Sequence, residues 1–120
     1  MRNYLVLLFF VGLVSSCYYN NEEDLFGIVP CDATNVTYST TITKIMNDNC
    51  VGCHSDASLQ GGISLEGYEK VKVFSAADGA LLGTIQHLNN FSPMPKNLPK
   101  ISDCDIAKVK KWVADGAPNN

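Results

Sequence analysis

Two cysteines and a histidine in the middle of the chain have a spacing suited to covalent and metal chemistry. Cys50, Cys53 and His54 read C-x-x-C-H, the pattern that attaches a c-type haem to a protein chain. Two thiols three residues apart lie on one turn of backbone, and each can bond a vinyl group on one porphyrin edge. The next residue can bring its imidazole to the iron, which the protein tunes through the second axial ligand and burial. The sequence therefore predicts one covalently bound haem c, with His54 as its proximal ligand.

The second axial position of the iron has three candidate ligands. Met94 lies in Pro-Met-Pro, where the two prolines stiffen the backbone and could hold a thioether against iron with little loss of entropy. His87 is the stronger intrinsic ligand, but at helical spacing it points away from the apolar stripe of its segment, toward solvent. Met46 belongs to an apolar stripe, and we expect it in the core. We therefore expect Met94 as the distal ligand, with a low-spin haem at moderate to high potential.

The start of the chain resembles an export and anchoring sequence. Arg2 precedes an apolar run over residues 4–14, which is too short to span a bilayer and suits a signal peptide. Small residues before Cys17 resemble a bacterial lipobox. This resemblance implies a lipoprotein signal peptide over residues 1–16 and a lipidated Cys17, followed by a flexible tether over residues 17–30. The predicted location is the periplasm or the outer membrane, with the lipid as the membrane anchor.

The cysteines not assigned to lipid or haem form a pair. Cys31 and Cys104 remain, and an even pair in an oxidising compartment predicts a disulfide. The bond would join positions 73 apart, for which the chain-entropy model gives about 4 kcal/mol of stabilisation. The alternative is two free, buried thiols.

Short helices must position these residues, because strand signals are poor throughout the chain. Helical spacing predicts one helix from residue 40 or 41 into the haem motif, one over 66–74, one over 80–88, and one from Ser102 to near Gly116. Ser102 and Asp105 resemble a capping box at the start of the last helix. A proline-rich loop over residues 89–100 carries Met94. The predicted fold class is all-α, with three to four short helices around one covalently bound haem.

Apolar stripes on two of these segments predict part of the core. The stripe of the third segment comprises Leu81, Leu82, Ile85 and Leu88. The stripe of the last segment comprises Ile106, Val109 and Val113, with Trp112 at its edge. The protein has few other large apolar residues, so we expect haem to complete the core and the haem-free chain to be poorly folded.

The charge balance argues against nucleic acid as a partner. Without Arg2, eight basic residues stand against 12 acidic ones, a net charge of −4. An acidic chain without a basic patch is a poor candidate for nucleic-acid binding. Lys96 and Lys100 flank the Met94 loop and could form a local positive rim for an acidic redox partner protein.

Other uses of the C-x-x-C-H residues stay open at the level of sequence. Zinc could bind Cys50 and Cys53 with His87 or Cys104 as a further ligand, although the chain has no second pair at metal-ligand spacing. A thiol–disulfide oxidoreductase would set C-x-x-C in a βαβ pattern, which is not visible. Ordinary disulfides are a third alternative. Among haem proteins, an open distal site could serve ligand sensing or peroxidase chemistry, for which His87 is the available acid–base group.

Residues 31–120 resemble a class I c-type monohaem cytochrome domain. The resemblance rests on the C-x-x-C-H motif, the Met94-Pro95 loop and the closing Trp-Val-Ala-Asp-Gly-Ala helix end, and it is closer to small exported bacterial lipoproteins with one such domain. It implies electron transfer to redox partner proteins rather than enzyme catalysis. The implied roles are thioether anchors for Cys50 and Cys53, proximal ligand for His54 and distal ligand for Met94.

The chain departs from that family at one point. Class I domains often have a proline soon after the haem motif, and its carbonyl orients the ligand histidine. No proline occurs in the stretch after His54, which contains Gly61, Gly62 and Leu65. We therefore expect another backbone carbonyl in this stretch to accept a hydrogen bond from the His54 ring.

Overall fold

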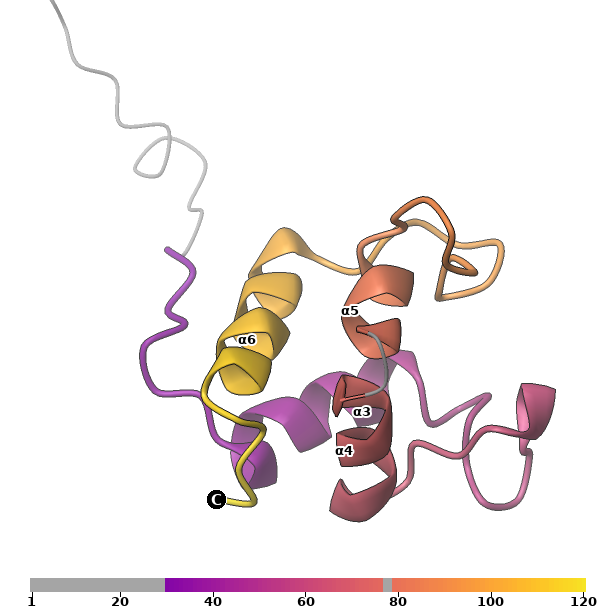
Figure 1. Cartoon of the computed structure of the whole chain (residues 1–120), viewed down its shortest axis with the longest axis horizontal. Coiled ribbons are helices and arrows are strands. Elements are labelled where there is room, and N and C mark those ends of the chain that lie inside the picture. Colours follow the sequence, from indigo (N-terminus) through magenta and orange to yellow (C-terminus); the bar gives the residue numbers. More distant parts are fainter. Residues whose placement is uncertain (1–29, 77–78) are drawn as a thin grey trace, which may run out of the picture. The chain divides into compact units, whose positions relative to one another are not determined.

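The computed structural model describes residues 30–76 and 79–120. The predicted signal peptide, Cys17 and the tether up to residue 29 lie outside these ranges. The described residues form helices and no strands, which confirms the all-α class. In order, the elements are the π-helical turn η1 (Tyr38–Ile42), α3 (Thr43–Asn49), the 3₁₀ turn η2 (Gln60–Gly62), α4 (Tyr68–Ala76), α5 (Ala80–Ile85) and α6 (Asp103–Ala114) (Figure 1).

The first helical stretch, η1 followed by α3, begins earlier than the sequence predicts. Its N-cap is Thr37, whose side-chain oxygen accepts the Thr40 N–H at 3.4 Å. Asn120 supports this start, because its Oδ1 accepts the Tyr38 N–H at 2.8 Å. The second contact joins positions 82 apart in the chain, so no local pattern could reveal it. The inner face of the stretch is as predicted, with Met46 in the core and 1% exposed.

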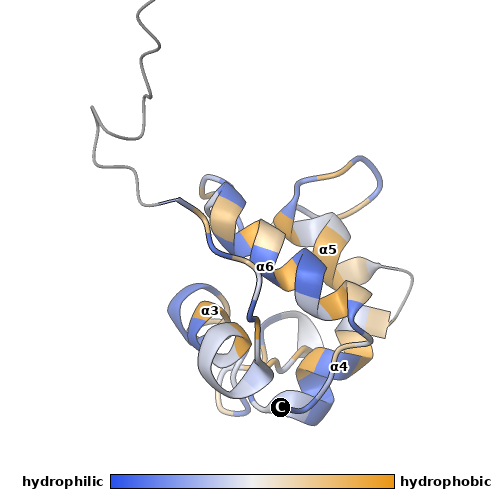
Figure 2. Cartoon of the chain, turned by 90° about the vertical axis from the view of Figure 1, so that its left-hand side faces the viewer, coloured by the Kyte–Doolittle hydropathy of each residue, from blue (hydrophilic) through white to orange (hydrophobic). Residues whose placement is uncertain are grey.

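Helix α6 is capped as the sequence predicts but buries a different residue. Ser102 accepts the Asp105 N–H at 3.0 Å, which confirms the N-cap. Trp112 lies at the centre of the buried face rather than at its edge, with 0% exposure, whereas Val113 is half-buried. The reason is a partner beyond the helix, because Trp112 Nε1 donates to the Pro118 carbonyl at 2.9 Å. Figure 2 shows both hydrophobic and hydrophilic residues along α6.

An aromatic core joins η1, α4 and α6; we use this name for Tyr38, Tyr68 and Trp112. The Tyr38 and Tyr68 rings meet edge to face at 5.0 Å, and the Tyr38 and Trp112 rings lie 5.8 Å apart. Such pairs stabilise beyond their buried area. Tyr68 also donates its hydroxyl hydrogen to the Ala117 carbonyl at 2.9 Å. This end of the molecule is therefore closed by side chains of the protein itself.

Helix α5 ends at Ile85, three residues before the predicted end. The N–H of Leu88 donates to the Gly83 carbonyl at 3.0 Å, and the N–H of His87 donates to the Thr84 carbonyl at 3.2 Å. His87 has a φ of 55°. This is the Schellman termination of a helix, in which a left-handed residue closes the last turn. Leu88 consequently lies outside the buried stripe and is 48% exposed.

The predicted disulfide between Cys31 and Cys104 is present, with 5.4 Å between the two Cα atoms. It fixes the chain ahead of η1 to the first turn of α6. The described helices include none with the length and apolarity needed to cross a membrane. The segments over residues 50–66 and 86–101 extend as two loops on the same side of the molecule (Figure 1).

Candidate haem site

A cavity of about 680 Å³ is lined by residues of both loops. Its size lies within the range of natural ligand pockets, about 300–1,000 Å³. The four residues predicted to bind haem, which are Cys50, Cys53, His54 and Met94, all line it. Most of the remaining wall is apolar and includes Ile63, Leu65, Phe74, Leu81, Ile85 and Ile101. A smaller hollow of about 320 Å³ beside α3 has charged and polar walls and contains none of the four predicted residues.

The C-x-x-C-H segment is wound into a turn by its own backbone. The N–H of Cys50 donates to the Met46 carbonyl at 2.8 Å, which continues the bonding pattern of α3. The Cys50 carbonyl then accepts the N–H of Cys53 at 3.1 Å and of His54 at 2.9 Å. Both cysteines and the histidine are thus fixed within one turn that begins on a buried helix.

The chain after the motif folds back and covers it. The Cys53 carbonyl accepts the Gln60 N–H at 3.2 Å and the Ser58 hydroxyl at 2.6 Å. The His54 carbonyl accepts the Leu65 N–H at 2.7 Å. The last contact brings the buried Leu65 side chain to the cavity wall beside the histidine.

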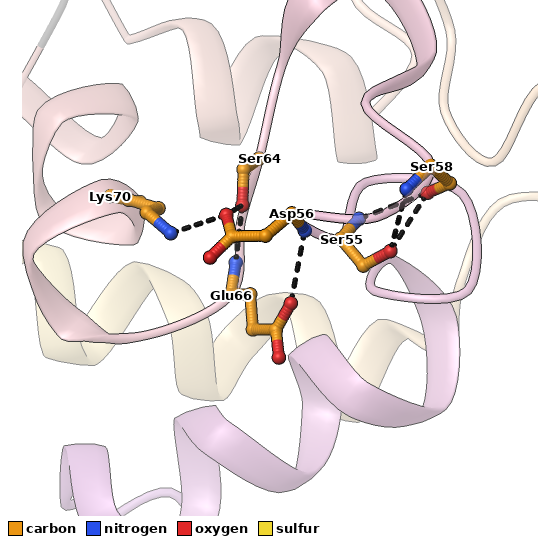
Figure 3. A network of polar contacts seen from close by, with 6 residues as sticks. All are labelled: Ser55, Asp56, Ser58, Ser64, Glu66 and Lys70. Carbon is orange, nitrogen blue, oxygen red and sulfur yellow. Dashed lines mark hydrogen bonds and ion pairs between the residues drawn. The ribbon is translucent and has the colours of Figure 1, made fainter.

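A polar network on the outside of this loop holds the fold-back in place (Figure 3). The Asp56 carboxylate accepts the Ser64 hydroxyl at 2.7 Å and pairs with Lys70 of α4, while the Asp56 N–H donates to Glu66 at 3.0 Å. The hydrogen bonds from Lys70 and Ser64 lower the pKa of Asp56 below its ordinary value. The network is exposed, and such ion pairs contribute little to stability; its main effect is to connect the motif loop to α4.

The His54 ring has a hydrogen-bonding requirement that the protein does not meet. Nδ1 of His54 is buried and has no hydrogen-bond partner, which holds for no other buried side-chain nitrogen or oxygen of the described residues. The expectation that a backbone carbonyl accepts from this ring is therefore wrong for this structure. Two carbonyls of the motif accept hydrogen bonds from other groups, since that of Cys53 accepts from Gln60 and Ser58 and that of His54 accepts from Leu65.

This unmet requirement is informative about the cavity. Native proteins rarely leave a buried polar atom unpaired, and the exceptions concentrate at redox, catalytic and ligand sites. The atom belongs to the histidine of C-x-x-C-H, which lines an apolar cavity together with two free thiols and a methionine. These residues fit a covalently held, largely apolar group that accepts an imidazole and a thioether on a metal, which is the chemistry of a c-type haem.

The two motif thiols are free, but their surroundings differ. Cys53 is exposed, whereas burial raises the pKa of the Cys50 thiol to about 11. Thiol–disulfide oxidoreductases instead lower the pKa of the attacking cysteine. The zinc alternative loses one ligand, because Cys104 is bound in the disulfide. The described part of the chain also contains no group of three His, Cys, Asp or Glu side chains arranged for a metal ion.

Both backbone polar groups of Met94 are hydrogen-bonded. Its N–H donates to the Thr84 carbonyl at 3.1 Å, and its carbonyl accepts from Nε2 of His87 at 3.0 Å. His87 was expected to face solvent, and this is wrong: it is half-buried against the loop because α5 ends before it. Thr84 is a site residue that the sequence did not indicate, and the sequence named His87 only in other roles, because the contacts of both residues depend on where α5 ends.

The two lysines near the Met94 loop differ in the structure. Lys96 lines the cavity, and its Nζ donates to the Ser92 hydroxyl at 3.3 Å. Lys100 pairs with Asp103 at 2.7 Å, which offsets its charge. A positive rim for an acidic partner therefore rests on Lys96 more than on Lys100.

Comparison of the chain with protein-family models, with curated proteins and with solved structures found no match. The function must therefore be inferred from the residues of the site. The structure brings Cys50, Cys53, His54 and Met94 to one apolar cavity, and it assigns Cys31 and Cys104 to a separate disulfide.

Proposed function

We propose that this chain is a monohaem c-type electron-transfer protein. The proposal rests on the shared cavity, which is lined by two free thiols, an imidazole and a thioether from segments 40 residues apart in the chain. When bound, haem would supply a one-electron redox centre whose potential depends on its axial ligands and burial. Cys50 and Cys53 would hold it by thioether bonds, with His54 and Met94 as the axial ligands.

The protein's own residues would fix the geometry and exclude water. The turn at Cys50 carries three of the four groups that would hold haem, within one hydrogen-bonded turn of backbone. Apolar side chains such as Leu65, Leu81 and Ile85 line the cavity and would limit access of water to the bound group. The fourth group, the Met94 thioether, comes from a loop that is hydrogen-bonded to the end of α5. Preformed ligands of this kind would keep the reorganisation on electron transfer small.

The bond from His87 to Met94 favours electron transfer over the alternative of an open distal site. Peroxidase chemistry needs an acid–base group that is available near the iron. Nε2 of His87 is already engaged with the Met94 carbonyl, and Met94 itself lines the cavity. A coordinated thioether leaves no free position for peroxide or a gas.

The proposal includes export and a lipid anchor at Cys17, because covalent attachment of haem to proteins that resemble this one takes place outside the cytoplasm. Cys17→Ser should move the protein from the membrane fraction to the soluble fraction while its haem content stays the same. Retention of the variant in the membrane fraction would contradict the lipid anchor without touching the haem proposal.

Optical spectra of exported protein, oxidised and reduced, test the central claim. We expect a low-spin haem that stays on the chain in a denaturing gel, detected by its peroxidase stain. The oxidised protein should show a weak band near the red end of the spectrum from the sulfur–iron bond, which Met94→Ala should remove. The matched control is Met46→Leu, because Met46 is a core methionine and its replacement should leave the band in place.

Two results would count against the proposal. Wild-type protein without covalent haem would overturn it, and so would a Cys50→Ala, Cys53→Ala double variant that still carries haem through denaturation. Rapid and complete binding of carbon monoxide to the reduced wild type would instead indicate an open distal site and support the sensing or peroxidase alternative.

A further inference from the structure

We propose that His87 is a positioning residue for the distal ligand: its side chain holds the Met94 backbone so that the thioether stays in the cavity. The inference rests on the proposed function, in which Met94 binds the haem iron. It assigns a role to an imidazole that does not line the cavity and is not one of the four predicted haem-binding residues.

The geometry is a closed set of hydrogen bonds at the end of α5. The Thr84 carbonyl accepts two N–H groups, that of His87 at 3.2 Å and that of Met94 at 3.1 Å. Nε2 of His87 lies 3.0 Å from the Met94 carbonyl oxygen. Since a carbonyl can only accept, Nε2 must carry the proton and donate it. One turn of chain thus holds both backbone polar groups of Met94.

The way in which α5 ends determines where the His87 imidazole points. His87 takes the left-handed position of the Schellman motif, with a φ of 55°. Histidine tolerates this conformation better than most residues. The reversal of the backbone at this point directs the side chain toward the returning loop rather than along the helix, and both His87 and Met94 are half-buried.

The Met94 loop has few other attachments. Ser92, Pro93 and residues 96–100 are exposed. Phe91, three residues before Met94, provides one further anchor, since its ring packs so close to Gly83 of α5 that a Cβ there would collide with it. A loop with little buried surface depends on individual hydrogen bonds for its position. Loss of the His87 bond should therefore raise the fraction of protein in which Met94 has left the iron.

Two substitutions separate the hydrogen bond from the backbone conformation. His87→Gln keeps an N–H donor at the distance of Nε2, whereas His87→Leu is of similar size and has no donor. Both replacements have a similar cost in the left-handed backbone conformation, so a difference between the two variants measures the effect of the N–H donor. Each variant is made in the full exported chain, and its covalent haem is quantified first.

Carbon monoxide binding to the reduced protein is the readout, because it requires the distal position to open. We expect His87→Leu to bind about two- to tenfold faster than wild type, the range that one net hydrogen bond provides. It should also show a weakened red-end band in the oxidised state. His87→Gln should lie near wild type in both measurements, while haem content stays equal in all three proteins.

The outcomes distinguish the two proposals. Equal haem content with an unchanged red-end band and carbon monoxide rate in His87→Leu would overturn the positioning role and leave the electron-transfer proposal intact. A His87→Gln variant as open as His87→Leu would also overturn it, because the backbone conformation would then explain the effect. A wild type without covalent haem would overturn the proposed function, and the role of His87 with it.

Discussion

The two ends of this molecule solve the problem of burial in different ways. At one end, Tyr38, Tyr68 and Trp112 fill the space between η1, α4 and α6, and Tyr68 and Trp112 donate hydrogen bonds to carbonyls of the C-terminal segment. At the other, two loops line an apolar cavity of about 680 Å³, and the buried Nδ1 of His54 has no partner. One end is therefore closed by the protein's own side chains, whereas the other has the open apolar cavity that the proposed haem would fill.

Removal of haem should give the largest effect, and it should fall on one end of the molecule. In the exported Cys50→Ala, Cys53→Ala double variant, we expect amide protection to be lost over residues 50–66 and 86–98. Protection should persist in α6 and η1, where the aromatic core is complete without a ligand. Hydrogen exchange measured residue by residue checks this, and the change should exceed that of any single substitution below.

This expectation narrows the prediction made from sequence, that the haem-free chain is poorly folded, to one end of the molecule. Uniform loss of protection, including in α6, would restore the earlier view and break the contrast between the two ends. Retention of amide protection at both ends would mean that haem is not needed to complete the core.

Truncation of Trp112 tests the aromatic core. The side chain is fully buried and donates to the Pro118 carbonyl, so Trp112→Ala should lower the free energy of unfolding by about 3–5 kcal/mol. Denaturant titration of haem-loaded protein gives the value. Val73→Ala on α4 is the control, since Val73 is 62% exposed and its truncation should change stability by about 0.5 kcal/mol or less. A similar small effect at Trp112 would contradict the packing described.

Substitution of Gly83 tests the packing at the cavity end. A Cβ at this position would collide with the Phe91 ring, so Gly83→Ala should destabilise by about 1–3 kcal/mol, as overpacking does. Because Phe91 anchors the Met94 loop, the variant should also bind carbon monoxide faster. Adding Phe91→Leu should recover part of the loss. A Gly83→Ala protein as stable as wild type would mean that the ring moves aside freely.

The smallest effect concerns the exposed network of the motif loop, and it depends on pH. Hydrogen bonds from Lys70 and Ser64 hold the pKa of Asp56 below its ordinary value. A lowered pKa in the folded state stabilises above the unfolded value of 3.8 and is lost as pH falls through the folded value. Lys70→Met should therefore raise the Asp56 pKa toward 3.8, as followed by NMR titration. An unchanged pKa would show that Lys70 is not the main partner.

Local sequence pattern predicts much of the end that the protein's own side chains close, and of the motif. The buried face of α3, the Ser102 cap of α6 and the pairing of Cys31 with Cys104 follow from periodicity, capping chemistry and cysteine count, and all three are present. The four predicted haem-binding residues line one cavity. Their role as ligands stays a prediction for the spectra to test.

The errors share a physical cause, which is that contacts made by residues outside a helix override the periodicity read within it. Trp112 is central because Pro118 and Tyr38 receive it. The first helical stretch begins early because Asn120 meets its N-terminus. Helical periodicity continues through His87, but the Schellman turn ends α5 at Ile85 and redirects the imidazole to Met94. Tyr38 and Asn120 are far away in the sequence, whereas Pro118 and Met94 are near but lie beyond the ends of α6 and α5, where helical periodicity gives no information.

Under the proposed function, the Cys31–Cys104 bond also bears on how the chain would mature after export. The four cysteines of residues 31–120 would enter the same oxidising surroundings, yet thioether formation would need two of them reduced. Any disulfide other than that between Cys31 and Cys104 would consume at least one of Cys50 and Cys53. A chain that oxidises its native pair first is left with the two thiols that haem attachment requires. The bond thus separates a structural pair of cysteines from the two free thiols that the proposed haem would use, and oxidation of the structural pair would then favour assembly instead of competing with it.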